Sequence, residues 1–177
     1  MELGRHSSAV EQRFHKAKVT GPNPVVGTFK HMTERQKKII EVGTQCIGAP
    51  YKYGATKVDI PNAFDCSLFI QYVYASVGIE LPRSTIEQAE LGATVSDISQ
   101  LEAGDLIFVH GTRGHYNAKF PDGIGHVVMY IGDGKVIHAG SRRTQENPVI
   151  EEGGVEVREL NDVIEKTKPV VCIKRLL

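Results

Sequence analysis

Residues 64 to 78 read FDCSLFIQYVYASVG and predict an apolar helix with a cysteine in its first turn. Apolar side chains recur three and four positions apart and share one face of this helix: Phe69, Ile70, Val73, Tyr74 and Val77. Asp65 is suited to cap the first turn, and Gly78 is suited to end the helix in the left-handed conformation that glycine tolerates. We therefore expect a buried helix that begins at Asp65 or Cys66.

Capping signals predict two further helices, one on each side of this segment. Residues 33–36 (TERQ) form a capping box for a helix that the sequence GAP at residues 48–50 ends. Residues 84–87 (STIE) form a second capping box, which starts a short third helix. The loop at residues 51–64 separates the first two helices, and loops of this length inside a compact domain often carry function.

The pattern changes from helices to strands after residue 105. Five apolar or alternating segments are separated by glycine-rich turns, at residues 106–109, 126–131, 135–139, 155–160 and 170–176. Because helices come first and strands afterwards, we predict an α+β fold with N-terminal helices packed on an antiparallel β-sheet. The lack of strict alternation between strands and helices argues against a doubly wound parallel sheet.

Length and composition are those of one ordinary globular domain. The chain has 177 residues, of which 41% are hydrophobic and 24% are charged. Its 21 basic and 21 acidic residues cancel, which argues against nucleic acid as a partner. No apolar run reaches the roughly 18 residues that span a bilayer, so no integral membrane segment is expected. We divide the chain into an N-terminal arm at residues 1–32, without sustained periodicity, and a domain at residues 33–177.

The N-terminal stretch gives information on the cellular location of the protein, and the cysteines show whether disulfides are expected. The polar N-terminal stretch lacks the apolar segment of a secretory signal. The chain therefore stays in the cytosol or has lost a signal, and the sequence leaves both open, as it does the oligomeric state. Cys46, Cys66 and Cys172 cannot all pair and are not spaced as in a zinc knuckle, so we expect neither a disulfide scaffold nor a metal site.

Cys66 is the strongest candidate for chemistry. Unpaired backbone N–H groups and the positive end of the helix dipole favour a thiolate at a helix start, and the thiolate is the attacking species in cysteine catalysis. The alternative is that Cys66 only fills the core as a small apolar side chain, which is how we interpret Cys46 and Cys172.

A nucleophilic thiol needs a base, and two histidines lie on adjacent predicted strands. A two-residue turn between these strands would pair His138 with Met129 and face it away from His126. A three-residue loop with Gly134 left-handed would pair His138 with Val128 and put both imidazoles on one face, within reach of each other. Only this second register supplies a base with an orienting partner. The sequence allows both registers, and for a catalytic pair we predict Gly134 at positive φ in a three-residue loop with His126 and His138 on one face.

Several short segments together form a pattern found in one known family. The first half of the chain contributes PYKYG at 50–54, FDCS at 64–67 and LPRS at 81–84 with Gln88. The second half contributes GDLIF at 104–108, GHV at 125–127 with YIG at 130–132, and IHA at 137–139. In this order and at this spacing, the segments resemble the NlpC/P60 family of papain-like cell-wall cysteine peptidases. The resemblance extends from Thr33 to the C-terminus and implies the papain-like NlpC/P60 fold.

The resemblance implies a peptidoglycan endopeptidase that cleaves stem peptides or muropeptides, commonly between γ-D-glutamate and a diamino acid. Cys66 would be the nucleophile, His126 the general base, and His138 the group that orients His126. The mechanism would need no metal and no cofactor.

The resemblance also implies a set of substrate-binding residues. Tyr51 matches the family tyrosine beside the nucleophile, which helps to bind the substrate or the oxyanion. Asp65 and Ser67 would line the pocket for the amino end of the substrate. Arg83 and Ser84 match a further motif on the side of the pocket.

The chain departs from the family pattern in three places. Ala55 and Leu68 stand where glycines are usual, which would tighten the wall of the groove. The segment at residues 110–122 is longer than usual, and we expect it to overhang the site and narrow the choice of substrate.

Three alternative functions compete with hydrolysis of stem peptides. A catalytically inactive module that binds wall peptides would have the same fold, although all three predicted catalytic residues are present here. A thiol acyltransferase or amidase of related fold is disfavoured, because permuted relatives have the histidine before the cysteine in the chain. Here Cys66 comes before His126. A zinc site would need an unusual ligand set, since the spacing of these residues matches no compact motif: Cys66, His110, His115, His126 and His138.

Overall fold

The computed structural model describes residues 32–111, 114–145, 147, 150–166 and 169–177. The arm predicted for residues 1–32 lies outside the described residues, apart from Met32. In the described part of the chain, no helix combines the length and the apolar character needed to cross a membrane.

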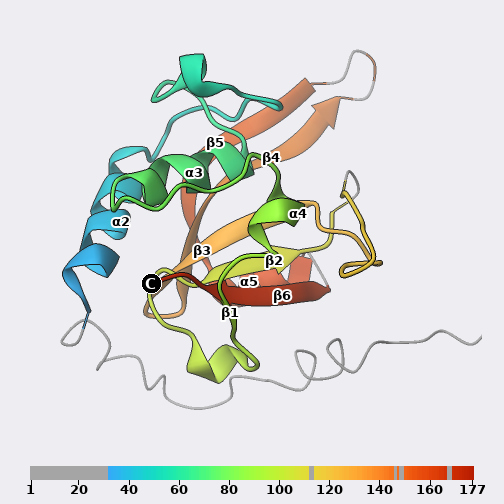
Figure 1. Cartoon of the computed structure of the whole chain (residues 1–177). Helices are drawn as coiled ribbons and strands as arrows, with labels where there is room; N and C mark the ends of the chain where they lie inside the picture. The colour runs from blue at the N-terminus through green and yellow to red at the C-terminus, as the bar shows by residue number, and fades with distance from the viewer. Residues whose placement is uncertain (1–31, 112–113, 146, 148–149, 167–168) are drawn as a thin grey trace, which may run out of the picture.

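Helices fill the first half of the described chain and strands fill most of the second half (Figure 1). The helices are α2 (Glu34–Gln45), η2 (Lys57–Asp59), α3 (Cys66–Ala75), α4 (Thr85–Gln88), η3 (Ile98–Gln100) and α5 (Leu160–Lys166). The strands are β1 (Ala93–Thr94), β2 (Leu106–Val109), β3 (His126–Gly132), β4 (Lys135–Gln145), β5 (Ile150–Glu159) and β6 (Val170–Arg175).

The strands form one antiparallel sheet in the order β1-β6-β2-β3-β4-β5. Helices α2 and α3 lie together across one face of this sheet (Figure 1). The predicted α+β fold, with N-terminal helices on an antiparallel sheet, is therefore confirmed. Helix α5 was not predicted, and it packs on the opposite face.

Alternation along the strands divides the apolar core into two layers. Val127 and Met129 of β3 pack into the cluster that contains α2 and α3. Val128 and Tyr130 point the other way, into the cluster that contains Val163 of α5. Complete burial of an apolar side chain of this size contributes about 1.5–3 kcal/mol, so each layer holds its helices firmly on the sheet.

The predicted caps set the helix starts. Thr33 and Gln36 form the reciprocal capping box that begins α2, with bonds of 2.8 and 3.2 Å. Asp65 caps α3 by accepting the Leu68 N–H at 2.9 Å, which makes Cys66 the first residue of that helix. The cap therefore places the thiol in the first turn, as the sequence predicts.

The turn between β3 and β4 differs from the predicted three-residue loop. Gly132 pairs with Lys135, so only Asp133 and Gly134 form the turn. Their φ angles are 52° and 69°, the left-handed values of a type I′ hairpin turn. The prediction of a positive φ at Gly134 is confirmed, and the prediction of a three-residue loop is wrong.

Strands β4 and β5 are longer than predicted. The sequence indicated an end near residue 139 and a new start near residue 155, whereas the two strands pair from Lys135–Glu159 to Gln145–Ile150. Glycines at 140, 153 and 154 interrupt the apolar pattern without interrupting the ladder, because glycine weakens a strand but does not prevent pairing.

Candidate active site

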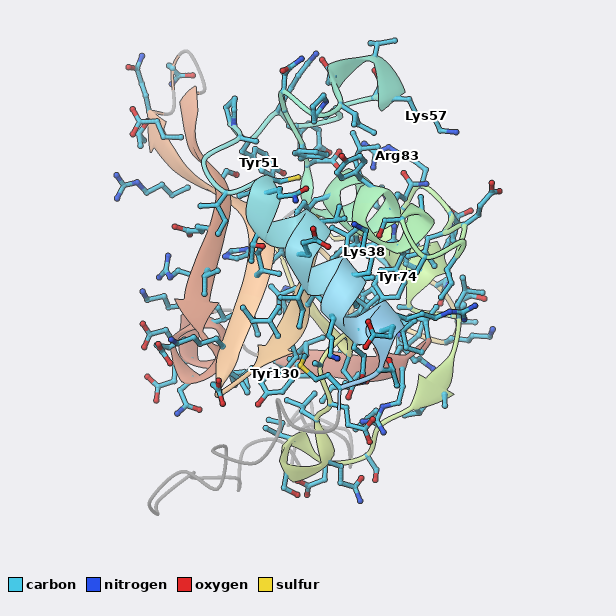
Figure 2. The ribbon with its side chains drawn as sticks, turned by 90° about the vertical axis from the view of Figure 1, so that its left-hand side faces the viewer. Lys38, Tyr51, Lys57, Tyr74, Arg83 and Tyr130 are labelled. Atoms are coloured by element: carbon cyan, nitrogen blue, oxygen red, sulfur yellow. The ribbon has the colours of Figure 1, made fainter. Side chains whose placement is uncertain are left out.

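One pocket collects every residue that the sequence marks as part of the site. Its volume is about 1380 Å³. Its lining includes Tyr51, Asp65, Cys66, Ser67, Arg83, Ser84, His126 and His138. Figure 2 shows Tyr51 and Arg83 toward one end of the molecule, with Tyr130 toward the other end.

A bulge in β3 decides how the two histidines meet. Met129 pairs with Ile137 and Tyr130 with Val136, but the next pair skips Ile131. The skipped residue shifts the register, so that continuing the ladder places His138 opposite Val128. A two-residue turn without the bulge would have turned the imidazole of His138 to the other face, because side chains alternate along a strand.

The two imidazoles are in direct contact. Nε2 of His126 lies 2.7 Å from Nδ1 of His138, and the ring planes meet at 77°. Because Nε2 of His126 is used in this bond, its Nδ1 is the nitrogen that remains for a proton from a nucleophile. The structure therefore places both imidazoles on one face and in contact, the arrangement that the predicted base and its orienting partner require.

Cys66 lies at the start of α3 with only 8% of its surface exposed. Backbone hydrogen bonds from Ser67 and Val127 reach its sulfur, and Val127 directly follows His126. Within the described residues, no hydrogen bond joins the thiol to His126, although both line the pocket. The Cys66 thiol and the His126 imidazole thus line the same pocket without a hydrogen bond between them.

Burial governs the proton affinity of the thiol. It raises the pKa of Cys66 to about 12, and the negative charge of Asp65 acts in the same direction. The backbone groups and Arg83 lower the pKa of Cys66 by less. The Ser67 N–H in the first turn of α3 does favour the thiolate, as the sequence predicts, but the loss of water outweighs it and raises the pKa of Cys66 overall.

Desolvation acts on the histidines in the opposite direction. It lowers the pKa of His126 to about 3, with the neighbouring His138 contributing. It lowers the pKa of His138 to about 4, with the charge of Arg158 contributing. At neutral pH the site therefore holds a thiol and two neutral imidazoles rather than an ion pair.

Arg83 connects the helix start to the pocket wall. Its guanidinium donates to the Asp65 carboxylate, to Oγ of Ser67 at 2.6 Å and to the Ala55 carbonyl at 2.6 Å. Ser67 in turn donates to Asp65 at 3.3 Å. Three of the predicted substrate-binding residues therefore form one charge-neutral cluster, which Ala55 joins through its backbone.

Tyr51 is placed by its backbone and Ser84 by its side-chain cap on α4. Tyr51 forms an isolated parallel bridge with Phe64 and donates its N–H to the Gly153 carbonyl at 2.9 Å, so it runs beside the segment that leads into α3. Ser84 caps α4. Gln88 at the end of α4 is fully buried and donates to the Ser67 carbonyl at 3.0 Å, which ties α4 to the first turn of α3.

The long segment between β2 and β3 lines one wall of the pocket through His110 and His115. Its tip is held by Glu90, which accepts from Nζ of Lys119 at 2.8 Å and from Nδ2 of Asn117 at 2.9 Å. The described part of the segment therefore borders the site, as its position in the sequence indicated.

Several charged residues of the pocket lining were missed in the sequence, and two of them are next to His138. Glu156 and Arg158 of β5 line the pocket next to His138. The alternation of Glu156 and Arg158 with Val155 and Val157 was visible in the sequence, but the pairing of β5 with β4 was not. Among the described residues, no group of three His, Cys, Asp or Glu side chains is arranged to hold a metal ion.

The fold and the site together define an α+β domain with a buried cysteine at a helix start and a bonded pair of histidines on the sheet. The model of the NlpC/P60 family matches residues 48–162. The chain therefore belongs to the NlpC/P60 family, and the resemblance found in the sequence is confirmed.

Characterised relatives and solved structures agree with this assignment. A probable endopeptidase of Corynebacterium glutamicum is 40% identical over 101 residues, which is 57% of this chain and 41% of that protein. A γ-D-glutamyl-L-lysine dipeptidyl-peptidase of Bacillus cereus is 38% identical over 101 residues, 57% of this chain and 27% of that protein. The chain thus matches less than half the length of these two relatives.

The structural neighbours include other NlpC/P60 family proteins, one of which is described as non-catalytic. An NlpC/P60 family protein from Bacillus cereus superposes with a TM-score of 0.59 at 32% identity, covering 79% of this chain and 39% of that one. RipD from Mycobacterium tuberculosis, described as a non-catalytic NlpC/P60 domain protein adapted to peptidoglycan binding, has a TM-score of 0.58 at 25% identity. That match covers 82% of this chain and 100% of RipD.

Proposed function

We propose that this domain is a cysteine endopeptidase that hydrolyses amide bonds of peptidoglycan stem peptides, with the bond between γ-D-glutamate and a diamino acid as its target. The observation that carries the proposal is the 2.7 Å bond between His126 and His138 in the pocket that contains Cys66. The relatives named as probable endopeptidases support the class of reaction. The Bacillus cereus dipeptidyl-peptidase supports the choice of bond.

In the proposed reaction, Nδ1 of His126 accepts the proton of Cys66 while the sulfur attacks the amide carbonyl. Because the thiol and the imidazole are both neutral at rest, the proton moves during the attack rather than before it. The backbone N–H of Cys66 at the helix start, with Tyr51, serves the oxyanion. His126 then gives the proton to the leaving amine, and an acyl-enzyme forms.

The second half of the reaction reverses these roles. His126 takes a proton from water, and the hydroxide attacks the acyl carbon. The sulfur of Cys66 then leaves and regains its proton from His126, which restores the thiol. His138 holds the His126 ring in place through both halves. Within this proposal, Asp65, Ser67, Arg83 and Ser84 bind the substrate.

The shape and charge of the pocket suit a peptide with charges of both signs. The volume of about 1380 Å³ exceeds the 300–1,000 Å³ of usual small-molecule clefts. Arg83 keeps 44% of its side chain exposed and offers a cation to a substrate carboxylate. Asp65 is the carboxylate beside Arg83, and we assign it to the amino end of the substrate.

The test is mass spectrometry of cleavage products. L-Ala-γ-D-Glu-diaminopimelate, its L-lysine counterpart and intact muropeptides are incubated with the wild type and with Cys66→Ala. We expect cleavage after γ-D-glutamate by the wild type and a loss on the order of 10³-fold or more in Cys66→Ala. Cys46→Ala removes a buried thiol outside the pocket and is the matched control, expected to cleave like the wild type.

Each result separates the proposal from its alternatives. Equal cleavage by the wild type and Cys66→Ala would remove Cys66 as the nucleophile. Binding of muropeptides without cleavage would make the domain a binding module, as RipD is described to be. Transfer of the acyl group to an added amine instead of water would indicate an acyltransferase.

A further inference from the structure

His138 carries a buried ring nitrogen that no hydrogen bond satisfies. Its Nδ1 is bonded to His126, while its Nε2 is inaccessible to water and has no hydrogen-bond partner among the described residues. Only 8% of the residue is exposed. A buried polar nitrogen without a partner costs free energy, and it leaves the tautomer of the ring undetermined.

The nearest charged acceptor lies on the neighbouring strand. Glu156 of β5 is the direct cross-strand partner of His138, so their side chains leave the sheet on the same face. Its Oε1 lies 3.7 Å from Nε2 of His138, slightly beyond hydrogen-bond distance. With 47% of its side chain exposed, Glu156 has room to rotate and close that gap.

We propose that Glu156 is a positioning residue that selects the tautomer of His138. A carboxylate can only accept, so it favours a proton on Nε2 of His138. Nδ1 of His138 then carries a lone pair and accepts from Nε2–H of His126. The proton on Nε2 leaves the lone pair of His126 on Nδ1, where the proposed mechanism needs a base. For this last consequence, the inference rests on the proposed function.

Arg158 competes with His138 for the same carboxylate. Its Nη1 donates to Oε1 of Glu156 at 3.0 Å, and the two residues are two positions apart on β5. The pocket lining also holds the carboxylates of Asp65 and Glu152 and the cations Arg83, Arg142 and Lys166. Among the described residues, Glu156 is the one carboxylate with an ion-pair contact to His138.

The first test reads the tautomers directly and needs no substrate. Nitrogen-15 NMR of the full chain labelled at histidine distinguishes protonated from bare ring nitrogens at pH 7. We expect Nε2–H of His138 in the wild type and in Glu156→Gln, whose amide oxygen still accepts. In Glu156→Ala we expect the Nε2–H form to lose population, with His126 changing in step because the two rings share one bond.

The matched control is Glu159→Gln, which removes one carboxylate from the same strand outside the pocket lining. Its spectrum is expected to match the wild type. Unchanged tautomers of both histidines in a folded Glu156→Ala protein would overturn the inference. A changed tautomer in a protein that cleaves no stem peptide would uphold the inference and overturn the proposed function instead.

The second test is kinetic and uses the tripeptide L-Ala-γ-D-Glu-diaminopimelate. Loss of an outer hydrogen-bonding partner of a catalytic histidine is expected to lower kcat about 10-fold in Glu156→Ala, with KM unchanged. Glu156→Gln is expected to restore most of kcat. An unchanged kcat in Glu156→Ala, or a loss that Glu156→Gln and Glu159→Gln share, would contradict a positioning role.

Discussion

Desolvation sets the protonation of the three residues that we predict to be catalytic. Cys66 holds its proton because burial raises its pKa to about 12, and His126 stays neutral because its pKa falls to about 3. A neutral imidazole is the form that accepts a proton, although a pKa this low makes His126 a weak base toward the thiol while the site is empty. The helix start alone does not bring about transfer of the Cys66 proton to His126, so this transfer depends on the bound substrate.

Gly140 makes room for the imidazole of His138. A Cβ at this position would lie 2.4 Å from Cε1 and 2.8 Å from Nδ1 of His138, closer than real side chains allow. We therefore predict that Gly140→Ala displaces the ring from His126 and lowers kcat on the order of 10²-fold. The measurement is kcat on the tripeptide substrate, with circular dichroism to verify folding.

The control for this prediction is Gly43→Ala in α2. A Cβ there would meet only ordinary contacts of 3.5–3.7 Å, so kcat should stay near the wild-type value. A folded Gly140→Ala protein with wild-type kcat would show that the contact between the two imidazoles is not needed for activity.

At the scale of secondary structure, the β3–β4 hairpin carries the decisive irregularity. A type I′ turn at Asp133-Gly134 and a skipped residue at Ile131 together give the register that the site needs. Either feature without the other would leave His138 on the opposite face from His126. The hairpin thus shows how one residue in a ladder determines whether two side chains meet.

Glu90 holds the segment between β2 and β3 against the end of α4. Because the ion pair with Lys119 is at the surface, it contributes little to stability, but it fixes one wall of the pocket. We predict that Glu90→Gln raises KM for intact muropeptides about 2–5-fold at low salt and leaves kcat unchanged. Steady-state kinetics at low and high ionic strength measures this.

High salt should bring the wild type toward the variant, since screening weakens the same pair. Glu41→Gln removes a comparable surface pair on α2, between Lys38 and Glu41, and should leave KM unaltered. If KM of Glu90→Gln equals that of the wild type at every salt concentration, the segment does not shape the binding of the substrate.

At the scale of the whole molecule, two buried neutral histidines make the stability depend on pH. An exposed histidine has a pKa of 6.5, whereas His126 and His138 in the fold have pKa values of about 3 and 4. Below pH 6.5 the unfolded chain therefore binds more protons than the folded chain, and the free energy of unfolding falls as the pH falls. The loss should be about 2 kcal/mol for each histidine, and so about 4 kcal/mol for the two together, between pH 7 and pH 5.

Urea unfolding at pH 7, 6 and 5 measures this dependence. The variant His138→Gln removes one of the two groups, so its stability should fall less over the same interval. Carboxylates with lowered pKa values, such as Asp59 and Glu90, lose their contribution at lower pH and are common to both proteins. Parallel curves for the wild type and His138→Gln would contradict the neutral, buried state of His138.

Much of the fold could be predicted because its signals are local. The capping residues at Thr33 and Asp65 determine where two helices begin, and the apolar period of residues 69–77 determines which face is buried. The segments around Cys66, His126 and His138, together with those at residues 50–54, 81–84 and 104–108, indicated the family by their order and spacing. The roles of the eight site residues stay predictions until the variants are measured.

The sequence by itself determined the class of fold, the helix that presents Cys66 and the family of the chain. Only the tertiary structure decided that His126 and His138 meet, that Glu156 stands beside them and that the thiol is neutral. Propensity and periodicity are properties of neighbouring residues, so they can be read along the chain. A one-residue bulge reverses the face of a strand, and a pKa depends on burial by distant segments, so both depend on the folded chain.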